Sequence, residues 1–120
     1  GVMTQVTIDH SLVNELVKNG DITEEEALKL PQSNIITRAI GISPDARIEV
    51  NRFKFNSADQ LLMCSDGLFK TVDKQVLKKV LEADEAISTK CQRLVTMANE
   101  AGGPDNITVL IGLNDKSQEG

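Results

Sequence analysis

The stretch QLLMCSDGLFKTV, residues 60–72, runs four apolar residues directly into a serine, an aspartate and a glycine. A short apolar run bounded by turn residues is typical of a buried strand, so residues 61–64 are predicted to form one. Asp66 follows the end of that strand, and Gly67 permits a sharp change of direction. A turn explains the glycine, but it does not require a carboxylate placed directly after a buried strand.

A second stretch, AGGPDNITVLIGL at residues 101–113, has the converse order, because Asp105 precedes an apolar run at 107–113. If the two predicted strands are antiparallel neighbours, ~4.8 Å apart, the end of one meets the start of the other. Asp66 and Asp105 would then share one edge of the sheet, where a hard cation such as Mg²⁺ or Mn²⁺ could separate their charges. The alternative is that both are ordinary turn residues.

The N-terminal residues predict a strand and then a short helix. Residues 2–8 alternate between apolar and polar side chains, which is the pattern of a strand. Ser11 can cap the start of a short helix that has one apolar face. Asn19 and Gly20 would end this helix, since glycine suits a helix C-terminus. No leader sequence is expected from this pattern.

A second short helix is predicted by Thr23 and Glu26, which have the spacing of a capping box, and Pro31 would end it. Residues 12–31 are charged on their outer side and are predicted to be a surface excursion. The segment NIITRAIG, residues 34–41, is expected to be extended.

The alternating residues 45–55 predict a strand with a bulge, where the apolar positions change phase. The segment SADQ, residues 57–60, is a predicted turn. These two predictions together place the strand at 45–55 in an antiparallel hairpin with the strand at 61–64.

Two longer helices are predicted between the two apolar strands. Asp73 is a candidate N-cap for the first, and the second carries apolar residues at helical spacing from Ile87 to Ala98. Gly102 and Gly103, followed by a proline, would end it. Residues 115–120 are expected to be a disordered tail.

The composition excludes several functional classes. The 120 residues carry a net charge of -5 and contain no Trp or Tyr, so the clustered basic and stacking side chains of a nucleic-acid-binding protein are lacking. No apolar run reaches the ~18 residues of a membrane span. Cys64 and Cys91 fit small buried apolar positions, and a reducing cytoplasm is the expected location.

Four segments in this order resemble one known family. They are TIDHSLVNELVKNGDITEEEA at 7–27, NIITRAIG at 34–41, LLMCSDGL at 61–68 and GGPDNITVLI at 102–111. Together they are similar to the C-terminal half of bacterial metal-dependent Ser/Thr protein phosphatases of the type 2C (PPM) class. The resemblance covers residues 7–113, which is nearly the whole chain.

The resemblance implies a fold and an activity. The fold class is α+β, part of an α-β-β-α sandwich of antiparallel sheets flanked by helices, with the family's N-terminal half lying outside this chain. Residues 1–114 would be the C-terminal half of a phosphatase domain, with a flap-like excursion at 12–31. The activity is hydrolysis of phosphoserine and phosphothreonine esters by a water that two Mn²⁺ or Mg²⁺ ions activate.

The family's motifs also imply roles for individual residues. Asp66 and Asp105 would be metal ligands, and Asn106, Ser65 and Gly67 would lie next to them. The family's phosphate-binding arginine and its Asp-Gly-x-x-Gly motif, whose aspartate bridges both ions, have no counterpart among the 120 residues. The chain is therefore expected to be a partial catalytic domain, inactive alone.

Two functional interpretations other than an enzyme stay open. The first is a non-catalytic phosphatase-like module that binds a partner or regulates a kinase pathway, and the second is a plain fragment with no independent role. Phosphoproteins, including those of a Ser/Thr kinase pathway, are the expected partners of the enzyme. Self-association through exposed sheet edges is expected for a half-sandwich.

Several other residues could take part in catalysis or binding, but a structural role is favoured for each of them. His10 is predicted to make a structural hydrogen bond in the turn formed by Asp9, His10 and Ser11, and Arg38 to make a structural ion pair. Ser65 has no nucleophile motif around it, so a local hydrogen bond is expected. Lys70 is expected to be solvated, as are Lys74, Lys78 and Lys79.

Overall fold

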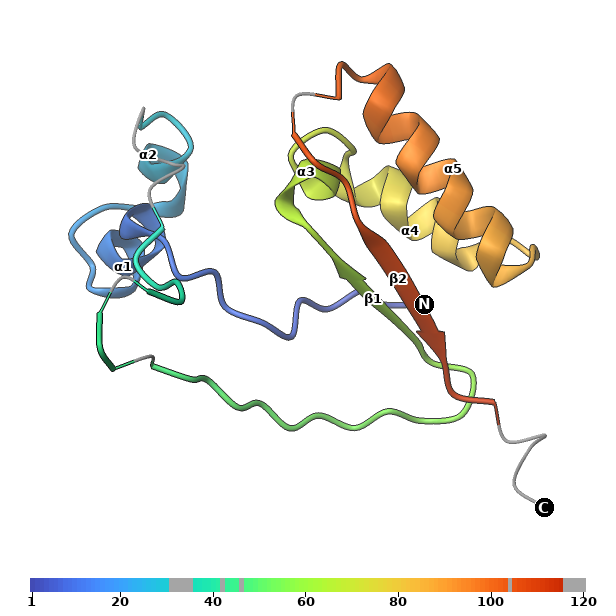
Figure 1. Ribbon diagram of the computed structural model, residues 1–120, viewed down its shortest axis with the longest axis horizontal. Helices are drawn as coiled ribbons and strands as arrows, with labels where there is room; N and C mark the ends of the chain where they lie inside the picture. The colour runs from blue at the N-terminus through green and yellow to red at the C-terminus, as the bar shows by residue number, and fades with distance from the viewer. Residues whose placement is uncertain (31–35, 42, 46, 104, 116–120) are drawn as a thin grey trace. The chain divides into compact units, whose positions relative to one another are not determined.

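The computed structural model describes residues 1–30, 36–41, 43–45, 47–103 and 105–115 of the chain (Figure 1). The described residues form two compact units, one made of residues 4–53 and the other of residues 1–3 together with 54–120. The class is mixed α+β, with five helices and one two-stranded antiparallel sheet among the described residues.

The unit at residues 4–53 contains two short helices, α1 (Leu12–Lys18) and α2 (Glu24–Ala27). The Ser11 hydroxyl accepts a hydrogen bond from the Asn14 amide at 3.2 Å and caps α1, as predicted. Thr23 and Glu26 cap the start of α2 by bonding to each other's backbone amides, which confirms the capping box. The predicted helix end at Pro31 lies outside the described residues.

Two N-terminal segments that were predicted to be extended do not form strands in the structure. Residues 2–8 form no strand, although their side chains alternate. Around residues 34–41, of which the structure describes 36–41, the pairing is limited to an isolated antiparallel bridge between Ser11 and Ile36. Alternation produces a strand only where a second backbone lies alongside to accept the ladder hydrogen bonds, and this single bridge is the extent of such pairing among the described residues of this unit.

The sheet consists of β1 (Gln60–Cys64) and β2 (Val109–Leu113). The strands are antiparallel, and the register pairs Cys64 with Val109 at one end and Gln60 with Leu113 at the other. This antiparallel pairing of the two apolar stretches was the condition for bringing Asp66 and Asp105 together, and it is confirmed.

The predicted hairpin between residues 45–55 and β1 is wrong, because the described part of 45–55 forms no strand and β1 takes β2 as its partner. The turn at residues 57–60 does form, with Ala58 at φ 67°. The Ala58 amide donates to the Asn114 carbonyl at 3.0 Å, so the turn extends the pairing toward β2.

Three helices belong to the same unit as the sheet: α3 (Asp66–Phe69), α4 (Lys74–Glu82) and α5 (Ile87–Glu100). Asp73 caps α4 by accepting from the Gln75 amide at 2.8 Å, as predicted. Gly102 and Gly103 follow α5 with positive φ angles of 116° and 48°, which glycine adopts without strain. The Gly103 amide bonds back to the Ala98 carbonyl and ends the helix.

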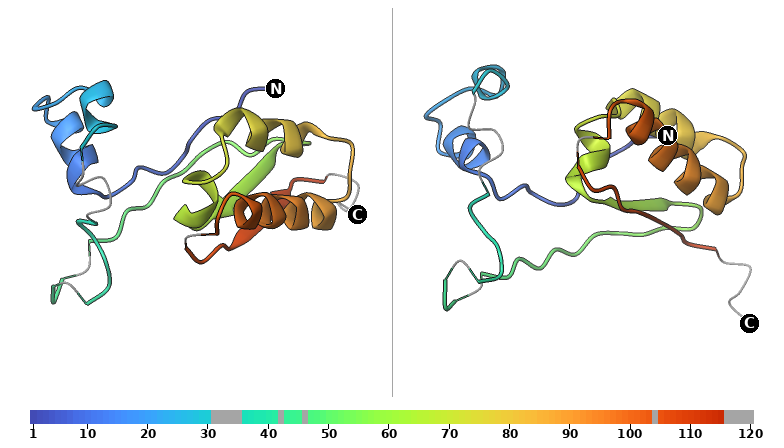
Figure 2. Two further views of the ribbon diagram at one scale, coloured as in Figure 1. Left: turned by 90° about the horizontal axis from the view of Figure 1, so that it is seen from above. Right: turned by 45° about the horizontal axis from the view of Figure 1, so that its top comes forward.

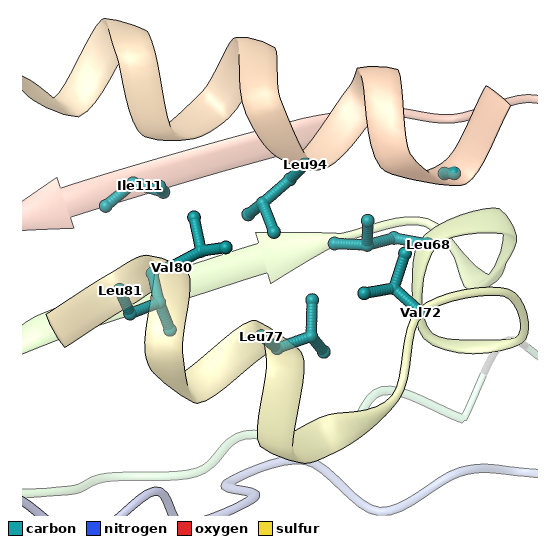
Figure 3. Packing of buried hydrophobic residues seen from close by; sticks show 8 residues of the cluster. Leu68, Val72, Leu77, Val80, Leu81, Leu94 and Ile111 are labelled. Carbon is teal, nitrogen blue, oxygen red and sulfur yellow. The ribbon is translucent and has the colours of Figure 1, made fainter. Parts of the chain in front are cut away.

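The hydrophobic core of this unit lies between the helices and one face of the sheet (Figures 2 and 3). Leu68 of α3 and Leu94 of α5 are fully buried at its centre. The buried members of the cluster come from α3, α4, α5, β2 and the loop after α3: Leu68, Val72, Leu77, Val80, Leu81, Leu94, Ala98 and Ile111. The first turn of helix after β1 therefore belongs to the core, which holds the Ser-Asp-Gly segment in place.

The opposite face of the sheet is apolar and exposed. Met63 and Leu110, which pair across the strands, are 55% and 53% exposed. Side chains alternate between faces along a strand, so these residues point away from the core that their neighbours Leu62 and Ile111 contact. The second sheet of the expected sandwich is not among the elements that the described residues form.

One buried charge was not predicted. Lys90 of α5 is only 6% exposed, and its ammonium donates to the Leu81 carbonyl at 2.6 Å and to the Gln60 side chain at 3.2 Å. It occupies the C-terminal end of α4, where a cation is favoured by the unpaired carbonyl groups. Lys90 therefore joins α4, α5 and β1 through polar contacts.

None of the helices in the described part of the chain is long and apolar enough to cross a membrane. Cys64 and Cys91 are free and partly buried against the core, as expected for small apolar positions.

Candidate metal site

Ser65 ties the end of β1 to the start of β2. Its hydroxyl donates to the Asn106 carbonyl at 3.1 Å and accepts from the Thr108 amide at 2.9 Å. Its own backbone amide donates to the Thr108 carbonyl at 3.0 Å. The local hydrogen-bonding role predicted for Ser65 is confirmed, and these bonds hold the segment before β2 against the segment after β1.

Gly67 allows the two segments to approach each other closely. A Cβ atom at this position would lie 2.4 Å from the Asn106 carbonyl oxygen, a distance that no side chain tolerates. The φ angle of Gly67 is not in the left-handed region, so the glycine is needed here for space and not for conformation. This contact and the Ser65 bonds place residues 65–67 beside residues 105–108.

Asp66 and Asp105 are brought together by this arrangement. Asp66 is the first residue of α3, where the free amides of a helix start favour a negative charge. Asp105 directly precedes Asn106, whose carbonyl accepts from Ser65 and lies against Gly67, the two residues that flank Asp66. The shared edge predicted for the two acids is therefore present, although they lie far apart in the sequence.

Asn106 contributes through its main chain. Its carbonyl accepts from Ser65, and its amide donates to the Asp105 carboxylate at 2.7 Å. That last bond lies within the loop and orients the Asp105 side chain. Asn106 is thus a neighbour of both acids, in the position that the sequence indicated.

Lys70 is exposed to solvent, as predicted, but it also makes an ion pair that was not predicted. Its ammonium lies 2.8 Å from Asp66 Oδ2, in an ion pair between residues four apart. The Lys70 ammonium is the main cause that holds the pKa of Asp66 below its usual value, against a smaller opposing effect of desolvation. Asp66, and more weakly Asp105, raise the pKa of Lys70 in return. The spacing of the two residues on a helix was the signal that could have revealed the pair.

The chemistry of these groups suits part of a site for a hard divalent cation. Carboxylate oxygens are the ligands that Mg²⁺ and Mn²⁺ prefer, and both acids are accessible to solvent. In the ranges that the structure describes, no group of three or more His, Cys, Asp or Glu residues could hold a metal ion. Asp66 and Asp105 therefore fit a metal ion as two members of a larger ligand set.

The other cluster of charged side chains lies in the unit at residues 4–53. His10 Nε2 is 2.6 Å from a Glu49 carboxylate oxygen, and an Arg38 nitrogen approaches the same ring nitrogen at 3.5 Å. The Asn51 side chain is the main cause that lowers the pKa of Glu49, with smaller contributions from His10 and Arg38. His10 therefore contacts Glu49, a distant residue that the sequence did not reveal, and not a group of its own turn as predicted. Arg38 contacts the His10 ring, so the ion pair predicted for it stays a prediction.

Comparison with known proteins relates this chain and its fold to a family. The Ser/Thr phosphatase Stp of Listeria monocytogenes is 41% identical over 121 residues, which is 99% of this chain and 47% of that protein. The Ser/Thr phosphatase structure from S. agalactiae superposes with a TM-score of 0.80 at 43% identity, over 90% of this chain and 45% of that one. No family model matches the chain.

A third comparison concerns the metal. The catalytic domain of the Ser/Thr protein phosphatase PstP, in complex with two manganese ions, has a TM-score of 0.67 and 33% identity. It is matched over 90% of this chain and 44% of its own length.

The chain belongs to the PPM (type 2C) family of bacterial Ser/Thr phosphatases. It spans about half the length of the curated relatives that it matches. The resemblance drawn from the four sequence motifs is thereby confirmed, and the α+β structure matches about half of the family fold.

Proposed function

We propose that this chain is part of a metal-dependent protein Ser/Thr phosphatase and supplies two ligands, Asp66 and Asp105, to its two-metal site. The observation that carries the proposal is that Asp66 and Asp105 stand on adjoining segments at the joined ends of β1 and β2, where Ser65 and Gly67 contact Asn106. The manganese complex of the relative PstP supports the choice of Mn²⁺ or Mg²⁺. When bound, such ions supply an activated water and stabilise charge on the phosphate oxygens.

The chain's own residues position the ligands. Ser65 and Gly67 hold the two loops together, and the Asn106 amide orients the Asp105 carboxylate. Asp66 is held at the start of α3, which is anchored by the fully buried Leu68. A site built on packed elements keeps its carboxylates in place before the cation arrives, which reduces the entropy lost on binding.

The substrates of the complete enzyme are proposed to be phosphoserine and phosphothreonine residues of proteins, such as those phosphorylated by a Ser/Thr kinase. The chain alone holds two of the ligands, so we expect it to hydrolyse p-nitrophenyl phosphate in the presence of Mn²⁺ hardly above the rate of a blank. Robust turnover that Asp66→Asn abolishes would show that the chain assembles a full site, for instance between two copies.

Titration of the ¹⁵N-labelled chain with Mn²⁺ tests the ligand role directly, because the paramagnetic ion broadens the signals of nearby amides. We expect selective loss of the Gly67 and Asn106 signals in the wild-type chain. Asp66→Asn and Asp105→Asn should each abolish the selectivity while the remaining spectrum is preserved. Asp84→Asn, which removes an exposed charge between α4 and α5, is the matched control.

Two outcomes would contradict the proposal. One is selective broadening that persists in both Asn variants, because the ion would then be held elsewhere. The other is an equal loss in Asp84→Asn, because the ion would then respond to net charge and not to a site.

A further inference from the structure

Lys70 is the cation that faces the candidate ligands. Its backbone amide donates to the Asp66 carbonyl at 3.1 Å, which completes the helical turn and brings its side chain over that of Asp66. The ammonium then lies 2.8 Å from Asp66 Oδ2. Within the described residues, Asp66 is the ion-pair partner that Lys70 has.

We propose that Lys70 is a resident counter-cation that competes with the metal for Asp66 and thereby sets the metal affinity of the site. This inference rests on the proposed function, because it requires Asp66 to be a ligand. Lys70 is neither a ligand nor a catalytic residue in this account. It is a residue that determines how much metal is needed to fill the site.

The competition follows from the geometry. An ammonium that is hydrogen-bonded to Asp66 Oδ2 occupies the space in which a cation would contact that oxygen. A divalent ion that binds this oxygen must displace the ammonium, and an ion that binds the other oxygen, Oδ1, is repelled by the ammonium beside it. The Lys70 side chain is 43% exposed and is carried on a flexible stem, so it can leave toward solvent without disturbing the core.

When no metal is bound, Lys70 stabilises the arrangement of the two acids. Asp66 and Asp105 repel each other once both are ionised, which tends to separate their loops. The Lys70 ammonium lies close enough to be attracted to both carboxylates and offsets that repulsion. Lys70 therefore stabilises the metal-free arrangement, and this stabilisation is what a metal ion has to overcome.

The expected effect is modest, because both partners are nearly half exposed, at 43% and 46%. Exposed ion pairs contribute weakly, and solvent screens the repulsion between the two cations. We expect Lys70→Met to tighten Mn²⁺ binding by about threefold to tenfold.

Calorimetric titration of the chain with Mn²⁺ tests this, with three variants compared with wild type. Lys70→Met should bind more tightly, whereas Lys70→Arg keeps the charge and should stay near the wild-type affinity. Lys79→Met removes an exposed lysine of α4 and gives the same change in net charge, so it should leave the affinity near that of wild type. The ¹⁵N spectrum of each variant checks that the fold is retained.

The outcomes separate this inference from the proposed function. Unchanged or weaker binding in Lys70→Met, or equal tightening in Lys79→Met, would overturn the role of Lys70 and leave the ligand role of Asp66 standing. Wild-type binding that Asp66→Asn does not affect would overturn both.

Discussion

Gly67→Ala tests the contact that brings the two aspartates together. A Cβ atom on residue 67 would lie 2.4 Å from the carbonyl oxygen of Asn106 and 3.2 Å from its carbonyl carbon. Both are backbone atoms, which cannot rotate away as the tip of a side chain can. We therefore expect alanine to push the loop that carries Asp105 away from the start of α3.

The magnitude follows from the distance. An ordinary contact at this position begins at 3.4 Å, so the loop has to move by about 1 Å. Overpacking of this kind costs about 1–3 kcal/mol, and the better helix propensity of alanine offsets up to about 1 kcal/mol. We expect the free energy of unfolding to fall by about 1–2 kcal/mol. A shift of that size also stretches the hydrogen bonds from Ser65 to Asn106 and Thr108.

Urea denaturation followed by circular dichroism measures the stability, and titration with Mn²⁺ measures the site. Gly112→Ala is the matched control, because its added Cβ would meet the Leu61 side chain at an ordinary 3.9 Å. That variant should keep or slightly raise the stability, since glycine weakens a strand interior. A Gly67→Ala chain with the stability and Mn²⁺ affinity of wild type would refute the close-approach argument.

Four further outcomes are expected. Ser65→Ala loses two hydrogen bonds between the loops and should lower the free energy of unfolding by about 1 kcal/mol in urea denaturation. Lys90→Ala should cost about 2 kcal/mol, whereas Lys90→Met, which keeps the apolar stem, should stay within about 1 kcal/mol of wild type. The Lys70 ammonium lowers the pKa of Asp66, so the ion pair stabilises the fold at pH values above the ordinary aspartate range. That stabilisation is lost as the pH falls through the lowered pKa of Asp66. Urea denaturation at several pH values should therefore show a smaller loss of stability on the acid side for Lys70→Met than for wild type. Burial raises the pKa of Cys64, so iodoacetamide should modify it more slowly in the folded chain than in urea, and equal rates would contradict its burial.

The exposed sheet face suggests an assembly test for the proposed self-association. Met63 and Leu110 pair on that face and are each about half exposed. If this face mediates association, Met63→Lys should lower the apparent mass in sedimentation at high chain concentration. An unchanged mass distribution would argue against the sheet face as the contact.

The local elements could be predicted from the sequence because their signals lie within a few residues. The cap at Ser11, the box between Thr23 and Glu26 and the cap at Asp73 each involve a side chain and an amide two or three positions away. Such bonds form wherever the backbone begins a helix, so they depend little on the rest of the fold.

The pairing of strands could not be predicted in the same way. Residues 45–55 alternate and precede a turn, which favoured a hairpin with β1, yet β1 pairs with β2. Alternation indicates which side chains share a face, but it does not indicate which backbone accepts the hydrogen bonds. The same limit applies to residues 2–8, whose alternation leads to no ladder among the described residues.

The candidate site combines both kinds of information. The residue types at positions 66 and 105, each next to an apolar strand, indicated carboxylates at a sheet edge, and the four motifs indicated the family. The ion pair of Lys70 was missed because a lysine in a charged helical segment reads as solvated, and only the turn of α3 directs it to Asp66. Glu49 was missed as the partner of His10 because the two lie far apart in the chain.

The sequence by itself determined the helix caps, the two apolar strands, the acids beside them and the family. Only the tertiary structure decided that β1 and β2 are antiparallel neighbours, that Gly67 is needed for its lack of a side chain, and that Lys70 forms an ion pair with Asp66. The physical reason is range: caps and periodicity depend on neighbours in the chain, whereas these three features depend on contacts between segments that folding brings together.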